Sequence, residues 1–188
     1  DYVYLFDKDS NTPLWSYDTE SNVCSVAISA DGEYIAAGTR NNFYLFEKDS
    51  STPLWTYSEG CNNEHSVAIS EDGEYLVLAS DSKIYLFVKD SSTPLWSYTV
   101  GDDVNTVAIS ADGKYIVSGT EDGDGRVHLH DRISSNPLWS HEIGGIGDVI
   151  QVAISADGDY IVAGTSDGTG MIYLYNKNSS TPLWSYDV

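Results

Sequence analysis

A repeat of about forty residues runs through this sequence and limits what it can fold into. Each copy carries a tryptophan near its end, and successive tryptophans are 40, 41, 43 and 45 residues apart. They are Trp15, Trp55, Trp96, Trp139 and Trp184. A period in this range is typical of β-propellers and solenoids, in which each copy is one structural unit that stacks on its neighbours.

One copy, residues 26–57, reads as four β-strands. Its apolar runs are short, rich in Val, Ile, Tyr, Phe and Trp, and separated by turn residues. We call the strands a to d in chain order, and in this copy they are SVAIS, EYIAAGT, FYLFEK and LWTY. Asp31-Gly32 between strands a and b is a strong hairpin signal. A four-stranded sheet cannot bury both faces alone, but it can when blades stack radially, as in a propeller.

We therefore predict an all-β fold, a β-propeller of four-stranded antiparallel blades with four full blades and an N-terminal half blade, about 18 strands in total. The half blade covers residues 1–18, and the full blades cover about 25–58, 66–99, 106–142 and 151–187. The 188 residues form one propeller domain or a fragment of a larger propeller. The half blade has only strands c and d, so we predict that this chain alone does not close a ring. A continuation of the chain, or another copy in a homo-oligomer, would cover the unfinished blades.

The charge of the chain narrows the classes of partner. Its net charge is −20, from 29 acidic and 9 basic residues. Such a surface repels phosphate groups, which argues against binding to nucleic acid or anionic lipid. Cationic partners or divalent metals fit the charge, and the alternative is that the acidity only keeps a repetitive β protein soluble or suits a salty medium. No run of about 18 apolar residues is present, so we expect no membrane span. The only methionine is Met171, which indicates a processed product or a piece of a longer protein.

The connections between strands differ in how much they vary among the copies. Every a–b turn keeps Asp-Gly, and every c–d connector resembles KDSSTP, whereas the b–c and d–a connections vary in length and sequence. In a four-stranded meander the two variable kinds share one end of the blade, so they gather on one face of the ring. Loops on a rigid scaffold are where binding residues are usually found. The candidates on this face are Asn41, Asn62, Glu64, His65, Asp102, Asp103, Glu121, Asp122, Asp124 and Asp167.

Parts of the repeat resemble the repeats of two propeller families. VAISADGEYIAAGT followed by FYLFEK resembles the WD-repeat unit, with Phe6-Asp7 and Phe46-Glu47 standing where that family has Trp-Asp. The segment YLFDKDSNTPLWSYDTES is similar to the quinoprotein-like (PQQ-type) propeller repeat, whose strand d carries a tryptophan that docks onto the next blade. This resemblance implies that the five repeat tryptophans are packing anchors between blades. Propellers of these families serve as scaffolds, receptors, assembly factors and enzymes, so the resemblance does not fix the function.

Two groups of residues in the copy at 106–142 could hold a metal ion. His128, His130 and His141 occupy positions that are Tyr or Phe in the other copies, and His128 and His130 share one strand face. A histidine cluster could bind zinc, and the alternative is aromatic-like packing or exposure to solvent. The acidic, glycine-rich loop at 121–125 contains Asp122 and Asp124 and suits calcium, with a solvated hairpin loop as the alternative. No other cofactor is expected.

The cysteines and one sequon bear on the compartment. Cys24 and Cys61 both lie in d–a connections of neighbouring blades, where they could form a disulfide or remain two unrelated thiols. A disulfide would imply an oxidising compartment. Asn178-Ser179-Ser180 fits a glycosylation acceptor in a c–d connector. Both features favour a location outside the cell or at its surface.

No catalytic motif stands out from the repeat. We find no nucleophile elbow, phosphate-binding glycine loop or zinc-protease helix, and no catalytic residue is predicted. The leading hypothesis is a non-enzymatic binding or structural scaffold that holds a protein or glycan partner on its variable loops. The alternatives are a self-assembling extracellular structural subunit and a fragment of a quinoprotein-type enzyme.

Overall fold

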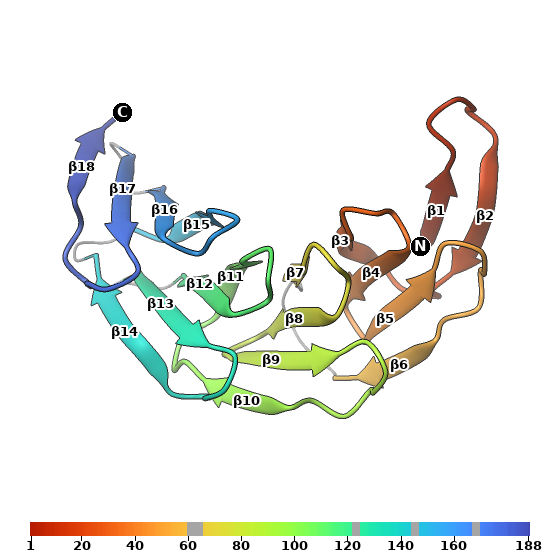
Figure 1. The fold of residues 1–188 in the computed structure, drawn as a ribbon, viewed down its shortest axis with the longest axis horizontal. Helices are drawn as coiled ribbons and strands as arrows, with labels where there is room; N and C mark the ends of the chain where they lie inside the picture. Colours follow the sequence, from red (N-terminus) through yellow and green to blue (C-terminus); the bar gives the residue numbers. More distant parts are fainter. Residues whose placement is uncertain (60–65, 122–124, 144–146, 167–169) are drawn as a thin grey trace.

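A computed structural model describes residues 1–59, 66–121, 125–143, 147–166 and 170–188 of the chain. Within these ranges the structure is all-β, with four antiparallel four-stranded sheets and one two-stranded sheet. The predicted propeller of four full blades and a half blade is therefore confirmed (Figure 1). No helix that could span a membrane is found in the described part of the chain.

The strands follow the repeat in order. The half blade contains β1 (Tyr2–Phe6) and β2 (Pro13–Asp18). The first full blade contains β3 (Val23–Ile28), β4 (Tyr34–Thr39), β5 (Asn42–Glu47) and β6 (Trp55–Ser58). The second contains β7 (Ser66–Ile69), β8 (Tyr75–Ser80), β9 (Lys83–Val88) and β10 (Trp96–Thr99). The third contains β11 (Val104–Ile109), β12 (Tyr115–Thr120), β13 (Arg126–Asp131) and β14 (Pro137–Glu142), and the fourth contains β15 (Val149–Ile154), β16 (Tyr160–Thr165), β17 (Met171–Asn176) and β18 (Trp184–Asp187).

The blades stack side by side in an open arc. Strands β3, β7, β11 and β15 lie along its inner side, and the d strands lie on the outside (Figure 1). The half blade and the fourth blade stand at opposite arms of the arc with a gap between them. The half blade remains a two-stranded sheet. The described chain alone thus forms an arc of a ring.

Apolar side chains fill the seams between successive blades because each strand alternates its side chains between two neighbouring blades. At the seam between the first and second blades, Phe43, Leu45 and Phe87 are fully buried in one cluster. The seam between the third and fourth blades buries Leu129, Ile161 and Tyr175 in the same way. These seam clusters make up the core, so the fold depends on contacts between neighbouring copies of the repeat.

The repeat tryptophans link each blade to the next through a hydrogen bond. The indole Nε1–H of Trp15 donates to the backbone carbonyl of Lys48 over 2.7 Å, and the equivalent bond of Trp96 to Arg132 is 2.8 Å. Trp55 and Trp139 make the same bond, to Lys89 and Lys177. Each acceptor is the residue that directly follows strand c of the next blade. Trp184, at the end of the arc, is half exposed.

Candidate functional site

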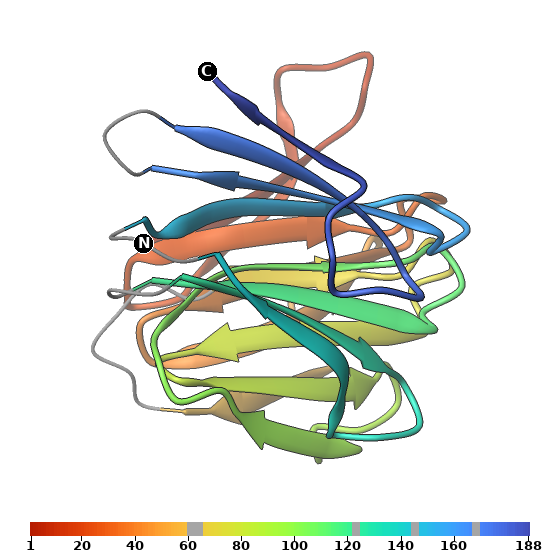
Figure 2. The same cartoon turned by 90° about the vertical axis from the view of Figure 1, so that its left-hand side faces the viewer.

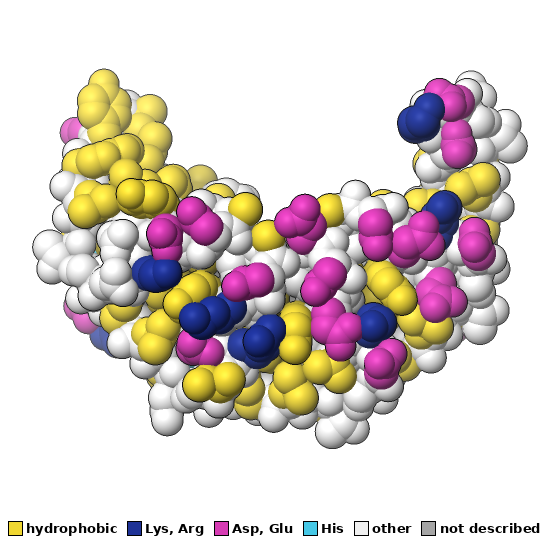
Figure 3. Space-filling view, in the orientation of Figure 1, with side chains coloured by type: hydrophobic (Ala, Val, Ile, Leu, Met, Phe, Trp, Pro, Cys, Tyr) yellow, Lys and Arg dark blue, Asp and Glu magenta, His cyan; other side chains and the backbone are white. Residues whose placement is uncertain are grey.

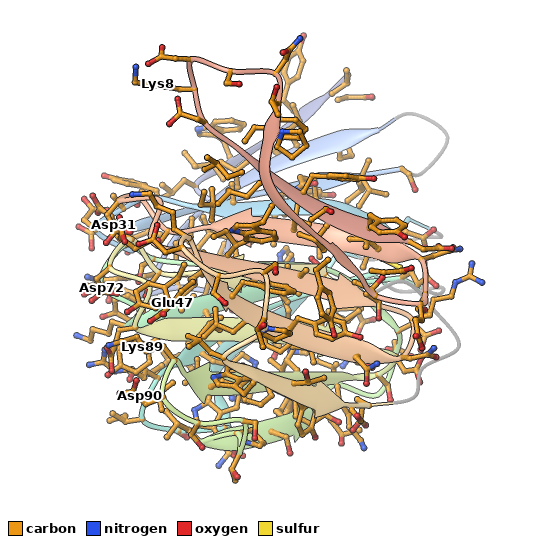
Figure 4. All side chains as sticks on the ribbon, turned by 90° about the vertical axis from the view of Figure 1, so that its right-hand side faces the viewer. Lys8, Asp31, Glu47, Asp72, Lys89 and Asp90 are labelled. Carbon is orange, nitrogen blue, oxygen red and sulfur yellow. The ribbon has the colours of Figure 1, made fainter. Side chains whose placement is uncertain are left out.

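The connections divide between the two ends of the blades. The a–b turns and c–d connectors share one end, where Lys48 N–H donates to the carbonyl of Glu33 over 2.9 Å. The b–c and d–a connections share the other end, where Val104 N–H donates to the carbonyl of Asp81 over 2.8 Å. We call these the constant end and the variable end. Figure 2 shows the strands running between the two ends, and Figure 4 shows that its labelled side chains, Lys8, Asp31, Glu47, Asp72, Lys89 and Asp90, all lie at the constant end.

A single hydrogen-bonding unit builds every a–b turn. In the first blade, Ser29 Oγ donates to Asp31 Oδ1 over 2.6 Å. Asp31 Oδ1 also accepts from Glu33 N–H at 3.0 Å. Ser29 Oγ also accepts from Tyr34 N–H at 3.0 Å. The hydrogen bond from Ser29 lowers the pKa of Asp31, because it favours the charged carboxylate. The other three turns repeat this unit with Ser70 and Asp72, Ser110 and Asp112, and Ser155 and Asp157.

The a–b turns also bind one another across the seams. Ala30 N–H donates to the carbonyl of Glu71, and Glu71 N–H donates to the carbonyl of Ala111, over 2.9 and 3.0 Å. Gly113 has a φ of +67°, and a Cβ there would collide with the Tyr75 ring of the preceding blade. The fold itself therefore explains why the Ser-x-Asp-Gly sequence of these turns is the same in every copy, and no ligand is needed to explain it.

An acidic hollow lies at the constant end, on the inner side of the arc. Its volume is about 650 Å³, and four exposed turn aspartates and Glu71 line it together with three alanines. The lining residues are Ala30, Asp31, Glu71, Asp72, Ala111, Asp112, Ala156 and Asp157. Figure 3 looks onto this end and shows carboxylates interspersed with Lys and Arg side chains. Within the described ranges no group of three or more His, Cys, Asp and Glu residues is arranged to hold a metal ion, which applies to this hollow as well.

This hollow is not predicted from the sequence. Its one sequence signal is Glu71, which stands where the other copies have Ala30, Ala111 and Ala156. The turn aspartates do not indicate a binding site in the sequence, because they are the same in every copy. That they converge on one hollow depends on the curvature of the arc, which the repeat pattern does not encode.

The variable end holds four of the ten predicted binding residues within the described ranges. Asn41 is exposed, and Asp102 is half-buried. Asp103 and Glu121 lie together, because Glu121 N–H donates to the Asp103 carbonyl over 2.9 Å. The remaining six lie outside the described residues: Asn62, Glu64, His65, Asp122, Asp124 and Asp167.

Tyrosines of strands c and d anchor two of the d–a connections at this end. Tyr85 Oη–H donates to Glu59 Oε1 over 2.6 Å, and Tyr57 donates to the other carboxylate oxygen over 3.2 Å. Burial, with the neighbouring Glu59 carboxylate, raises the pKa of Tyr85. In the first blade, Tyr44 Oη lies 3.4 Å from the carbonyl of Thr19. These contacts were not foreseen from the sequence, since they depend on how far each tyrosine reaches across its seam.

The three histidines do not form the predicted cluster. His128 and His130 point toward the second blade, where they contact Tyr98. His141 pairs across the sheet with Val127, faces the fourth blade, and places its Nδ1 2.8 Å from Tyr175 Oη. The expectation that the three could bind one metal was wrong, because strand d aims His141 at the opposite face of the sheet. The packing alternative describes these residues: His128 and His130 are buried, and His141 is half-buried.

Two further predicted sites fall largely on residues that the structure does not describe. The calcium-type loop has Asp122 and Asp124 outside the described ranges. Cys24 is half-buried with its sulfur 3.5 Å from the carbonyl oxygen of Asn22, whereas Cys61 is not described. Calcium binding and the Cys24–Cys61 disulfide stay predictions.

The stacking of four-stranded blades in an arc, each docked on the next by a tryptophan of strand d, defines this chain as a β-propeller protein. The chain belongs to the PQQ_2 family, described as outer membrane protein assembly factor BamB, whose model matches residues 1–186. The predicted resemblance to the PQQ-type repeat is thereby confirmed. None of the curated proteins matches the chain.

Solved structures share the fold at low sequence identity. Hydrazine synthase from Kuenenia stuttgartiensis superposes with a TM-score of 0.77 at 13% identity over 97% of this chain. A chain of the mitotic checkpoint complex superposes with a TM-score of 0.79 at 21% identity over 99%. The chain spans 53% and 59% of those two proteins, respectively. At these identities the likeness supports the propeller fold and carries no functional assignment.

Proposed function

We propose that this protein is a non-enzymatic binding scaffold that presents its variable end to a protein or glycan partner, outside the cell or at its surface. The observation that carries the proposal is the contrast between the two ends. At the constant end, the Ser-x-Asp-Gly turns stabilise the fold through hydrogen bonds within each turn, such as Ser29 to Asp31, and between neighbouring turns, such as Ala30 to Glu71. The variable connections do not repeat one side-chain unit from blade to blade, so their differences in sequence can serve recognition.

The alternative, a fragment of a quinoprotein-type enzyme, is not favoured. Such enzymes need a set of cofactor contacts that differs from blade to blade at the centre of the ring. In this chain the inner side of the arc is formed by the a strands and the a–b turns, whose sequences are close to identical from blade to blade, with Glu71 as a departure among the turns. We expect no bound quinone. Absorbance of the purified protein tests this, and a quinone chromophore would support the enzyme.

The binding proposal is tested by comparing two triple variants with the same change in charge. The variable-end variant is Asp102→Asn, Asp122→Asn and Asp124→Asn, and the constant-end variant is Asp9→Asn, Asp49→Asn and Asp90→Asn. All three constant-end residues are exposed. Partners would be sought on a glycan array and by crosslinking to proteins of the source organism.

We expect the variable-end variant to lose a partner that the constant-end variant retains. Because both variants lose three negative charges, a general electrostatic effect would weaken them equally. Loss of binding by the constant-end variant alone would refute the choice of face. Equal melting temperatures of the two variants would show that both are folded, so that a difference in binding does not come from unfolding.

A second candidate function is self-assembly through the end faces of the arc. The fourth blade exposes Trp184 and Tyr186, and the half blade exposes Tyr4 and Phe6. These are the residue types that pack inside the seams, where the Trp15 and Phe46 rings lie 5.3 Å apart. A further blade, from more of the same chain or from another copy, would fit these faces. Sedimentation equilibrium tests whether another copy of the chain covers these faces. A protein that stays monomeric at all concentrations would exclude self-assembly.

A further inference from the structure

One seam differs in chemistry from the other seams of the arc. The third blade turns His128 and His130 toward the second blade, and they are 3% and 0% exposed. The equivalent pairs in the other full blades are Tyr44 and Phe46, Tyr85 and Phe87, and Tyr173 and Tyr175. Only this seam therefore holds side chains that can take up a positive charge between pH 4 and 7 at these two positions.

Both imidazoles are packed among aromatic rings. Trp96 stacks on His130 with ring centroids 5.7 Å apart and an interplanar angle of 27°. Tyr98 meets His130 edge-on at 5.0 Å and His128 at 6.3 Å, and the two imidazoles are 6.3 Å from each other. An imidazolium formed here would thus lie beside a second imidazole in an apolar contact, where burial of charge is costly.

Among the described residues, the hydrogen bonds leave each ring with one nitrogen that has no partner. His130 Nδ1 lies 2.9 Å from the Ser135 carbonyl, which can only accept, so Nδ1 carries the proton. His128 Nδ1 lies 2.8 Å from Ser140 Oγ. Within the described part of the chain, the Nε2 atoms of both rings are buried without a partner, as is Ser118 Oγ on β12. A second proton on His130 must therefore go to Nε2, inside the seam.

The charged groups around the pair do not offset this cost. From β10 the neighbours are the neutral Trp96 and Tyr98, and from β12 and β14 they are serine hydroxyls. On β13 itself, Arg126 disfavours a second positive charge, and Asp102 in the d–a connection opposes that effect. Burial, as the largest cause, lowers the pKa of both histidines to about 4.

We propose that the seam between the second and third blades is an acid-sensitive joint, which opens when His128 and His130 take up protons while the other seams stay closed. Above pH 7 both rings are neutral and the seam packs as its neighbours do. In an acidic environment the protonated rings are more stable in water than in the seam, so the blades separate there. The aromatic faces of β10 and β13 would then be exposed to a partner or to proteolysis.

Hydrogen exchange measured by mass spectrometry tests this on the full chain at pH 7 and pH 4.5, with rates corrected for intrinsic exchange. We expect protection in β10 and β13 to fall at least tenfold more than in β6 and β9, which form the preceding seam. The decisive variant is H128Y/H130F, which restores the residue types of β9, and we expect it to abolish the selective loss. His141→Tyr removes a histidine from the opposite face of the same blade, and we expect it to retain the loss.

Three results would overturn the proposal. The first is uniform loss of protection across all seams of the unmodified chain. The second is a selective loss that persists in H128Y/H130F. The third is an ordinary titration of either imidazole, near pH 6.5, in the NMR spectrum of the folded protein, a measurement that needs no variant.

Discussion

Replacing Trp96 tests whether the tryptophans of strand d hold the arc together. Trp96 packs on the third blade and donates its indole N–H to the Arg132 carbonyl over 2.8 Å. Trp184 occupies the same place in its repeat but is 50% exposed, with no following blade in the described chain. Trp96→Ala and Trp184→Ala therefore remove the same atoms, and only the first removes a contact between blades.

The magnitude follows from these contacts. Truncating a buried Trp to Ala costs about 3–5 kcal/mol, and for the half-buried Trp96 we expect a loss at the low end of this range, about 3 kcal/mol. For a chain of this size, that lowers the melting temperature by roughly 6–12 °C. Trp184→Ala should cost less than about 1 kcal/mol. Trp96→Phe keeps most of the ring contact and loses the donor, so it should cost about 1–2 kcal/mol.

Thermal and urea unfolding at pH 8, where the histidines are neutral, measure all three variants. The expected order of stability loss is Trp96→Ala, then Trp96→Phe, then Trp184→Ala. Equal losses for Trp96→Ala and Trp184→Ala would refute the reasoning, because they would mean that tryptophan stabilises its own blade and not the seam. A wild-type-like Trp96→Phe would show that ring packing, without the N–H bond to Arg132, carries the docking.

Two further predictions concern stability. Gly113→Ala should destabilise the fold by more than Gly32→Ala, as measured by urea unfolding, because both residues have a positive φ but only the Cβ at 113 meets the Tyr75 ring. The melting temperature should fall as the pH drops from about 6.5 to about 4, because the unfolded histidines take up protons near their usual pKa while His128 and His130 in the fold do so only near pH 4. H128Y/H130F should flatten this decline in calorimetry, and an unchanged slope would contradict it.

The fold was predictable because one repeat supplied consistent evidence several times over. The Asp-Gly turns, the period-two strands and the five tryptophans each indicate a strand boundary or a seam, and they agree in every copy. The division into a constant and a variable end followed from the meander alone, and the hydrogen bonds of Lys48 and Val104 place the connections at those ends. Local pattern was sufficient here because each blade contacts mainly its neighbours.

The candidate site was less predictable, for two different reasons. The side of the sheet occupied by His141 could have been inferred: it lies two residues after Trp139, so it must share the docking face of that tryptophan. The acidic hollow could not, because its walls come from turns of four blades and meet only through the curvature of the arc. Residue spacing within one strand determines a face, whereas convergence between blades depends on the angle at every seam.

Because the copies are nearly identical, a residue that differs in one copy points to a contact that differs in that blade. Where Tyr85 reaches Glu59 across its seam, the d–a connection is tied down by a hydrogen bond of 2.6 Å. His128 replaces that tyrosine in the third blade, and its Nε2 is left without a partner among the described residues. A substitution that gives up such an anchor and buries two ionisable rings weakens one seam of an otherwise uniform structure. Stability that is a sum over seams is then limited by this one, so His128 and His130 should contribute most to the pH at which the arc first opens.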